Sequence, residues 1–132
     1  MNIASLERAL RNIVTDAGYD FATGNDDLIA QLLPDFPSAW LTTPKMLSID
    51  GQHSGRITYE LTLRLFDADT APHKRPHRLI KMQCQLLDIL TALSEHPDVV
   101  AVENITVTPA ANSFTLRGEL SQTAKARVTL WF

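Results

Sequence analysis

The sequence has little cysteine for disulfides and no excess of basic residues for binding nucleic acid. Its 132 residues include one cysteine, Cys84, so no disulfide can form within the chain. A chain without disulfides is typical of a reducing compartment. The formal net charge is -3, which disfavours a protein built mainly to coat nucleic acid, because such proteins carry a basic excess.

Long apolar runs are also missing. No stretch of 18 apolar residues occurs, so we expect no transmembrane helix and no membrane partner. The opening segment MNIASLERAL is interrupted by Glu7, Arg8 and Arg11, and it does not resemble a signal peptide. These features predict a cytosolic protein, of a host cell or of a bacterium.

Motifs for phosphate or metal binding are absent from the sequence. The five glycines are scattered singly, so no glycine-rich loop can cradle a phosphate. His73 and His77 have a spacing that suits a metal on a helix, but Pro76 lies between them and the segment reads as a loop. No cysteine pair or acidic neighbour completes a metal site of known type, so we interpret both as solvated histidines.

Two further candidates for chemistry have simpler interpretations. Cys84 lies on the apolar flank of an expected helix, where we expect a small buried hydrophobic side chain rather than a catalytic thiol. Asp67 and Asp69 lack the glycine and the terminal glutamate of a calcium loop, and we interpret them as solvated carboxylates. The sequence therefore predicts no enzyme, no metal, no cofactor and no small-molecule substrate.

What the sequence does contain is a balanced globular composition with two helical patterns. It is 45% hydrophobic and 20% charged, and its length suits one domain spanning residues 1–132. Steps of three and four residues between apolar positions predict two amphipathic helices. The positions are Ile3, Leu6, Leu10, Ile13, Val14 and Ala17 in the first helix, and Leu79, Met82, Leu86, Ile89, Leu90 and Leu93 in the second.

Between the helices, a short helix around residues 26–33 and a long hairpin are expected. Residues 39–49 are rich in strand formers, but Pro44 restricts them to an edge or bulged strand. Residues 50–55 read as a turn. Residues 56–66 alternate apolar and polar side chains, which is typical of a strand with one buried face. The hairpin can protrude as an arm around residues 39–66.

The last third of the chain predicts two or three more strands. Residues 99–108 change the phase of their apolar positions, and a bulge near Glu103 would explain that change. Residues 109–112 read as a turn. Residues 113–120 can extend as a strand, and residues 124–132 alternate apolar and polar side chains as a strand does.

Together these elements predict an α+β fold in the order α-β-β-α-β-β(-β). Short turns between consecutive strands favour a mostly antiparallel sheet of four to five strands. Two amphipathic helices then pack on one face of that sheet.

Two groups of residues are candidates for contact with other proteins. The first is an apolar set in the hairpin and the last strand, where a tryptophan falls on the polar phase. Its members are Trp40, Leu41, Met46, Leu47, Ile49 and Trp131. The second is a basic segment that meets phosphate, an acidic partner or only solvent. Its members are Lys74, Arg75, Arg78 and Lys81.

In length and element order the chain resembles the tail-terminator, or tail-completion, proteins of long-tailed bacteriophages and prophages. The resemblance spans almost the whole chain. It rests on the helix SLERALRNIV, the hairpin around IDGQHSGRITYELTLRLFD, the helix RLIKMQCQLLDILTAL and the closing strands VVAVENITVT and KARVTLWF. It is a likeness of pattern, and no single residue carries it.

The resemblance implies a structural role without catalysis. Proteins of this family form a ring, usually a hexamer, that caps the polymerised tail tube and offers a surface for the head to join. The genome passes through the hole without sequence-specific binding. The implied partners are further copies of the chain, the tail tube and head-completion proteins. The implied location is the cytoplasm of a bacterial host and then the virion tail.

Two alternatives stay open at this point. The chain can be a non-catalytic adaptor that binds another protein through its first hairpin and basic segment. It can also be a small enzyme or ligand-binding domain with a cleft between helices and sheet. That last hypothesis requires a polar residue on the core phase of a strand, and Tyr59 is nearly the only one.

Overall fold

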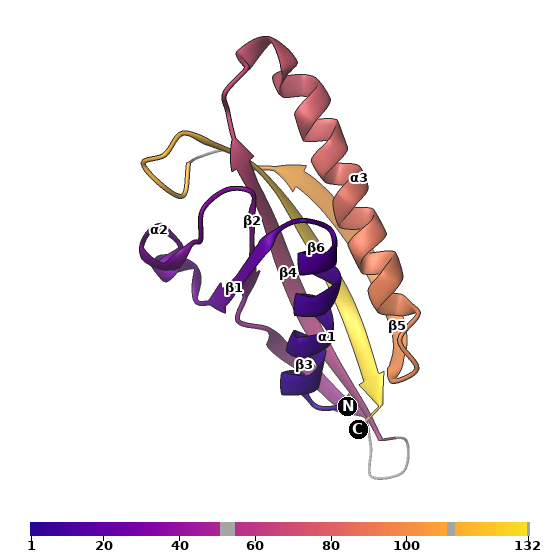
Figure 1. The fold of residues 1–132 in the computed structure, drawn as a ribbon. Helices are drawn as coiled ribbons and strands as arrows, with labels where there is room; N and C mark the ends of the chain where they lie inside the picture. The colour runs from indigo at the N-terminus through magenta and orange to yellow at the C-terminus, as the bar shows by residue number, and fades with distance from the viewer. Residues whose placement is uncertain (51–54, 111–112, 132) are drawn as a thin grey trace.

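The computed structural model of the chain describes residues 1–50, 55–110 and 113–131 (Figure 1). The expected α+β class is confirmed. The elements are α1 (Ile3–Asp16), β1 (Asp20–Gly24), η1 (Asp26–Leu28), α2 (Ile29–Leu32), β2 (Ser38–Thr42), β3 (Lys45–Asp50), β4 (Arg56–Ala68), η2 (Pro72–Lys74), α3 (Arg75–Ser94), β5 (Val99–Pro109) and β6 (Glu119–Trp131), where η marks a 3₁₀ turn.

The sheet is mixed and larger than expected. Its six strands run in the order β1-β2-β4-β6-β5, and β3 also pairs with β4. The pairing of β1 with β2 is parallel, whereas every other pairing is antiparallel. The expected antiparallel sheet of four to five strands therefore missed β1. Its sequence, DFATG, has little alternation and ends in glycine, so no pattern marked it as a strand.

The long strands β4 and β6 form the centre of the sheet. They pair over 13 positions, from Arg56 opposite Trp131 to Ala68 opposite Glu119. On the other side of β4, β2 pairs with its second half and β3 with its first half. Thr43 and Pro44 separate β2 from β3, which confirms the expected break at this proline. Residues 51–54, in the expected turn between β3 and β4, lie outside the described residues.

The main hydrophobic core lies between one face of the sheet and the two long helices, as expected (Figure 1). The side chain of Asn2 caps α1 by accepting a hydrogen bond of 2.9 Å from the backbone N–H of Ser5. Burying each aliphatic side chain of this core contributes about 1.5–3 kcal/mol. The helical members are Leu6, Leu10 and Val14 of α1 and Met82, Leu86, Ile89, Leu90 and Leu93 of α3.

A second, smaller core lies on the opposite face of the sheet, and the sequence did not predict it. It consists of Ile29, Leu33, Trp40 and Phe66, and the ring of Phe114 packs edge-on against Phe66. The η1–α2 segment and the loop before β6 therefore cover one end of this face. The expected short helix around residues 26–33 is confirmed by η1 and α2.

The expected strand over residues 113–120 is wrong for most of its length, because β6 begins at Glu119. The Glu119 carboxylate accepts hydrogen bonds from the backbone N–H groups of Phe114 and Thr115 at 2.7 and 3.0 Å. These bonds hold the chain in a compact loop instead of a ladder. Residues 111–112, in the expected turn before it, lie outside the described residues.

Candidate assembly surface

The strand β3 is an open edge of the sheet. Among the described strands it pairs only with β4, so its outer backbone groups have no ladder partner. One register shift, between Met46 and Ser48, makes Leu47 the extra residue of a bulge. An unpaired edge can add a strand or a side-chain layer from another chain.

This edge strand carries three exposed apolar side chains. Ile49 is 58% exposed, Met46 48% and Leu47 38%. Met46 and Ile49 are paired with Tyr59 and Ile57 of β4, which join the core under the helices, but Met46 and Ile49 themselves stay exposed. Single exposed apolar residues are ordinary, whereas a cluster on an edge strand is typical of an interaction site.

Trp131, at the end of β6, is a further exposed apolar side chain, on the opposite face of the sheet from Met46 and Ile49. Its indole is 40% exposed and lies opposite Arg56 in the β4–β6 register. The Arg56 guanidinium sits 4.7 Å from the ring centroid, which is a cation–π contact. The tryptophan therefore lies on the polar face of the sheet, as its phase in the sequence predicted.

A shallow hollow of about 520 Å³ lies on the polar face of the same region. It is lined by Leu47 and Ser48 of β3, Thr58 of β4, Glu103 of β5, and Arg127 and Thr129 of β6. Thr58 and Thr129 are linked by a hydrogen bond of 3.0 Å. The hollow therefore offers a rigid floor of hydroxyl and charged groups beside the apolar side chain of Leu47.

Two members of the predicted apolar set do not belong to this surface. Trp40 is fully buried in the second core, and Leu41 is buried in the main core. Both lie on β2, which the helices cover on one side and the η1–α2 segment on the other. Only Met46, Leu47, Ile49 and Trp131 of the predicted set are exposed.

The predicted basic segment is divided between paired and unpaired side chains. Arg75 forms an ion pair of 2.6 Å with Asp69, and Arg78 forms one of 2.7 Å with Asp67. Within the part of the chain that the structure describes, Lys74 and Lys81 have no ion pair. The two arginines hold the segment before α3 against the helix, and the lysines are left for other contacts.

The second helix pattern begins earlier than expected, which changes the surroundings of His73 and His77. Helix α3 starts at Arg75 and includes Pro76 in its first turn, where a missing N–H is tolerated. His73 lies in η2 and His77 in the first turn of α3, and both side chains are exposed. No group of three or more metal-ligating side chains is found over residues 1–50, 55–110 and 113–131.

Cys84 is exposed, so the expectation that it is a buried hydrophobic residue is wrong. The main core takes its α3 side chains from positions such as Met82 and Leu86, and Cys84 lies on the far side of the helix. Tyr59, the polar residue on the core phase of β4, is buried in the main core. Its burial gives no support to the ligand-binding cleft that the sequence left open as an alternative.

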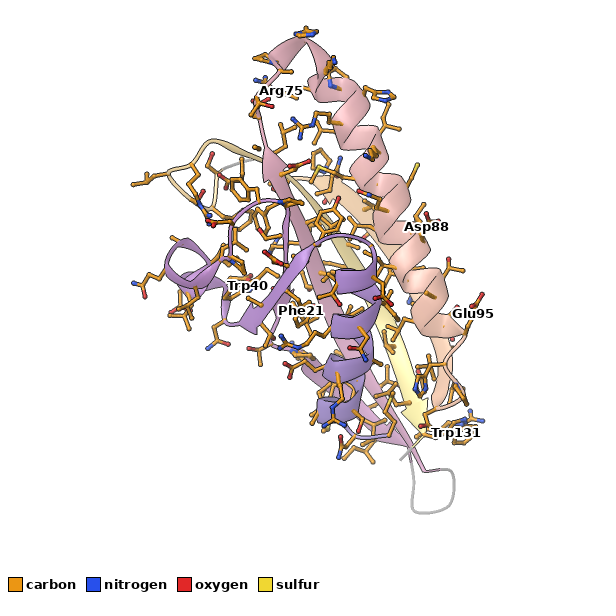
Figure 2. All side chains as sticks on the ribbon, viewed as in Figure 1. Phe21, Trp40, Arg75, Asp88, Glu95 and Trp131 are labelled. Carbon is orange, nitrogen blue, oxygen red and sulfur yellow. The ribbon has the colours of Figure 1, made fainter. Side chains whose placement is uncertain are left out.

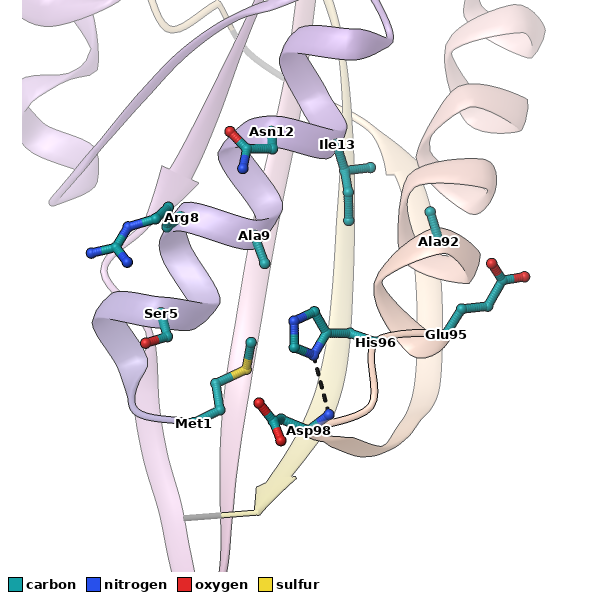
Figure 3. Close-up of a pocket in the computed structure, with 10 residues that line it drawn as sticks. All are labelled: Met1, Ser5, Arg8, Ala9, Asn12, Ile13, Ala92, Glu95, His96 and Asp98. Carbon is teal, nitrogen blue, oxygen red and sulfur yellow. Dashed lines mark hydrogen bonds between the residues drawn. The ribbon is translucent and has the colours of Figure 1, made fainter.

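A groove of about 560 Å³ lies between α1 and the end of α3 (Figure 3). Ala9 and Ile13 of α1 and Ala92 of α3 give it apolar walls. Arg8 of α1, whose side chain points away from α3 in Figure 3, lines one side, and His96 and Asp98 line the other. The Nδ1 atom of His96 accepts a hydrogen bond of 3.1 Å from the backbone N–H of Asp98, which closes the helix end.

A smaller hollow of about 370 Å³ lies where α1 ends and β1 begins. There the Tyr19 hydroxyl donates a hydrogen bond to the side-chain carbonyl of Gln85. Burial, with the nearby charge of Asp67, raises the pKa of Tyr19 to about 12. The tyrosine is therefore a neutral donor that joins β1 to α3, and it does not act as a base near neutral pH.

Two carboxylates fasten the second core. Burial alone would raise the pKa of Asp26, but hydrogen bonds from Thr42 and Arg64 outweigh it and hold that pKa below its usual value. For Glu119, burial is likewise outweighed by hydrogen bonds from Thr115 and the backbone, so its pKa is also lowered. Both carboxylates therefore anchor the segments around the second core.

No family model matches the chain, and no curated protein matches it. Of the helices in the described part of the chain, none has the length and apolar character needed to cross a membrane.

Proposed function

We propose that this chain is a structural assembly protein of a phage or prophage tail, like the ring-forming tail terminators that it resembles. In this proposal copies of the chain form a ring that caps the tail tube and presents the surface that the head joins. DNA passes through the ring without sequence-specific binding. The protein is made in the bacterial cytoplasm, ends in the virion tail and catalyses no reaction.

The observation that carries the proposal is the exposed apolar edge of β3. Met46, Leu47 and Ile49 lie on an unpaired strand, with Trp131 at the end of β6. A ring requires a heterologous contact, in which one patch of a subunit meets a different patch of the next. An edge strand with exposed apolar side chains supplies the first of these patches, because a neighbour that covers it gains apolar burial and backbone hydrogen bonds.

The adaptor alternative has less support from the described residues. Besides the first hairpin, which the ring proposal also uses, it relies on the basic segment, where Arg75 and Arg78 already pair with Asp69 and Asp67. A partner would have to compete with these ion pairs, and each is a short contact between charged groups.

The test is the solution mass over a concentration series, measured by light scattering, with negative-stain images of any large species. The proposal predicts closed six-membered rings, each of about six times the chain mass of 14.7 kDa. Chains that grow without closing, or no species larger than a dimer at any concentration, would contradict it.

A further inference from the structure

One face of α3 is not covered by the rest of the chain. Ile80 is 59% exposed and Leu87 46%, and the exposed Cys84 lies between them. Steps of four and three residues place these side chains in one stripe along the helix. Because these side chains are exposed, the stripe faces away from the sheet, which α3 covers in Figure 1.

A column of four charges runs beside the stripe at intervals of seven residues. Lys74, Lys81, Asp88 and Glu95 are all exposed, and within the ranges that the structure describes none of them forms an ion pair. Seven residues are close to two helical turns, so the four side chains lie along one line. Figure 2 shows Asp88 and Glu95 pointing away from the sheet.

The order of these charges is unfavourable for the helix itself. Lys74 is the N-terminal cap residue of α3 and Glu95 its C-terminal cap residue. The helix dipole favours acidic groups at the N-terminus and basic groups at the C-terminus, which is the reverse of this order. Neither end of the column stabilises α3, so the pattern calls for another explanation.

We propose that a second copy of the chain docks on this face, with the two α3 helices side by side and antiparallel. In that orientation Lys81 faces Asp88 of the second copy and Lys74 faces Glu95 of the second copy. Cys84 then packs beside Leu87 of the second copy, as in an antiparallel coiled coil. A parallel pair would place like charges opposite each other. The column is therefore complementary to itself in one orientation only.

This contact is isologous and closes at two copies, whereas the ring contact at β3 is heterologous. The two contacts use different surfaces, so one can be lost while the other remains. A single pair of helices is a small interface, and we expect an association that depends on concentration and weakens with salt.

The experiment uses Cys84 as a built-in probe, because it is the single cysteine of the chain. A short bis-maleimide is added to chains that carry Ile49→Lys, which removes the β3 contact from the measurement. We expect a covalent dimer whose yield falls about tenfold with Asp88→Lys. We expect the same fall with Lys81→Asp, and recovery in the chain that carries both changes.

Two controls accompany these variants. Asp27→Lys changes the net charge as Asp88→Lys does, at an exposed acid of η1 on the opposite face of the sheet from α3, and leaves the yield unchanged. Circular dichroism shows whether each variant is folded, so that a lost cross-link is not mistaken for lost structure.

Three results would overturn the two-fold contact. They are an absent dimer in the Ile49→Lys chain at every concentration, a yield that is indifferent to Asp88→Lys, and a folded double variant that does not recover. Closed rings formed by the chain without Ile49→Lys, beside any of these results, leave the proposed function standing. A salt-sensitive dimer, together with no rings from the chain without Ile49→Lys, would support the contact and contradict the ring.

Discussion

The edge strands β3 and β5 lie on opposite sides of the long central strands. They differ in the features that keep an exposed strand from pairing with another chain. β5 has two register shifts, near Val99 and between Glu103 and Thr106, and it ends at Pro109. β3 has one register shift and an apolar surface. Natural proteins blunt their edges with bulges, prolines and polar side chains. β5 follows this rule more fully, and this difference supports the proposal that β3 is the edge used for contact.

The strongest way to break this comparison is to place one charge on each edge in turn. Ile49→Lys on β3 should weaken self-association about 100-fold, which corresponds to roughly 2.7 kcal/mol, because an unpaired charge would be buried in the contact. Ile105→Lys on β5 is the matched control, since Ile105 is also partly exposed. Light scattering measures both. Equal losses for the two variants would mean that β3 is not special.

The bulge of β5 can be tested through Asn104, whose φ of 53° is in the left-handed region. Asn104→Ala should lower the free energy of unfolding by about 1–2 kcal/mol, because a Cβ without a compensating polar group is unfavourable there. Asn104→Gly should cost little or stabilise slightly, since glycine adopts this conformation freely. Urea unfolding measures both variants. An alanine variant as stable as the wild type would contradict the strained bulge.

The loop after β5 should make stability depend on pH through Glu119. Its pKa is lower when folded than when unfolded, so its contribution is present above the ordinary value of 4.5 and lost as the pH falls through and below it. Glu119→Gln should cost about 1 kcal/mol at neutral pH and flatten this loss. Asp26 should keep part of the pH dependence of stability in the Glu119→Gln variant, because its pKa is lowered too. Urea unfolding measures the free energy of unfolding of both chains between pH 7 and 3. If it falls equally with pH in the wild type and in Glu119→Gln, Glu119 does not cause the loss of stability.

The smallest expected effect concerns Trp131, which lies at the end of β6 on the same end of the sheet as β3. Arg56→Gln removes the cation–π contact and should cost about 0.5 kcal/mol, measured by urea unfolding. With Trp40→Phe as background, Trp131 is the sole tryptophan and its emission reports on this surface. A blue shift on assembly would place Trp131 in the contact, and an unchanged spectrum would place it outside.

The amphipathic patterns predicted much of the fold. The spacing of Leu6, Leu10 and Val14 predicted α1, and the alternation along β4 predicted its buried face; both were confirmed. The break at Pro44 and the bulge near Glu103 were also confirmed, because proline and a change of phase are local signals.

The parts that were missed depend on contacts distant in sequence. Trp40 was predicted as part of an apolar contact surface in the first hairpin, but the η1–α2 segment and Phe66 bury it. The side chain of Arg117 donates to the backbone carbonyls of Leu33 and Pro34, about 80 residues away, and helps to hold the loop that was predicted as a strand. No local pattern contains such information.

For the candidate surface, the sequence selected Met46, Leu47, Ile49 and Trp131 but not their arrangement. Exposure on an open edge emerged only from the pairing of β3 with one strand. The charges of α3 were predicted only in part, because the basic segment included Lys74 and Lys81 but not Asp88 and Glu95. The interval of seven residues is visible in the sequence and could have linked them.

Hydrogen exchange of the backbone amides, compared between dilute and concentrated protein, tests the central claim most directly. An assembly contact on β3 should slow exchange in residues 45–50 as the concentration rises, while residues 99–109 of β5 exchange at the same rate. Slower exchange in β5 with no change in β3 would contradict the account. Exchange rates that do not change with concentration in either strand would contradict it too.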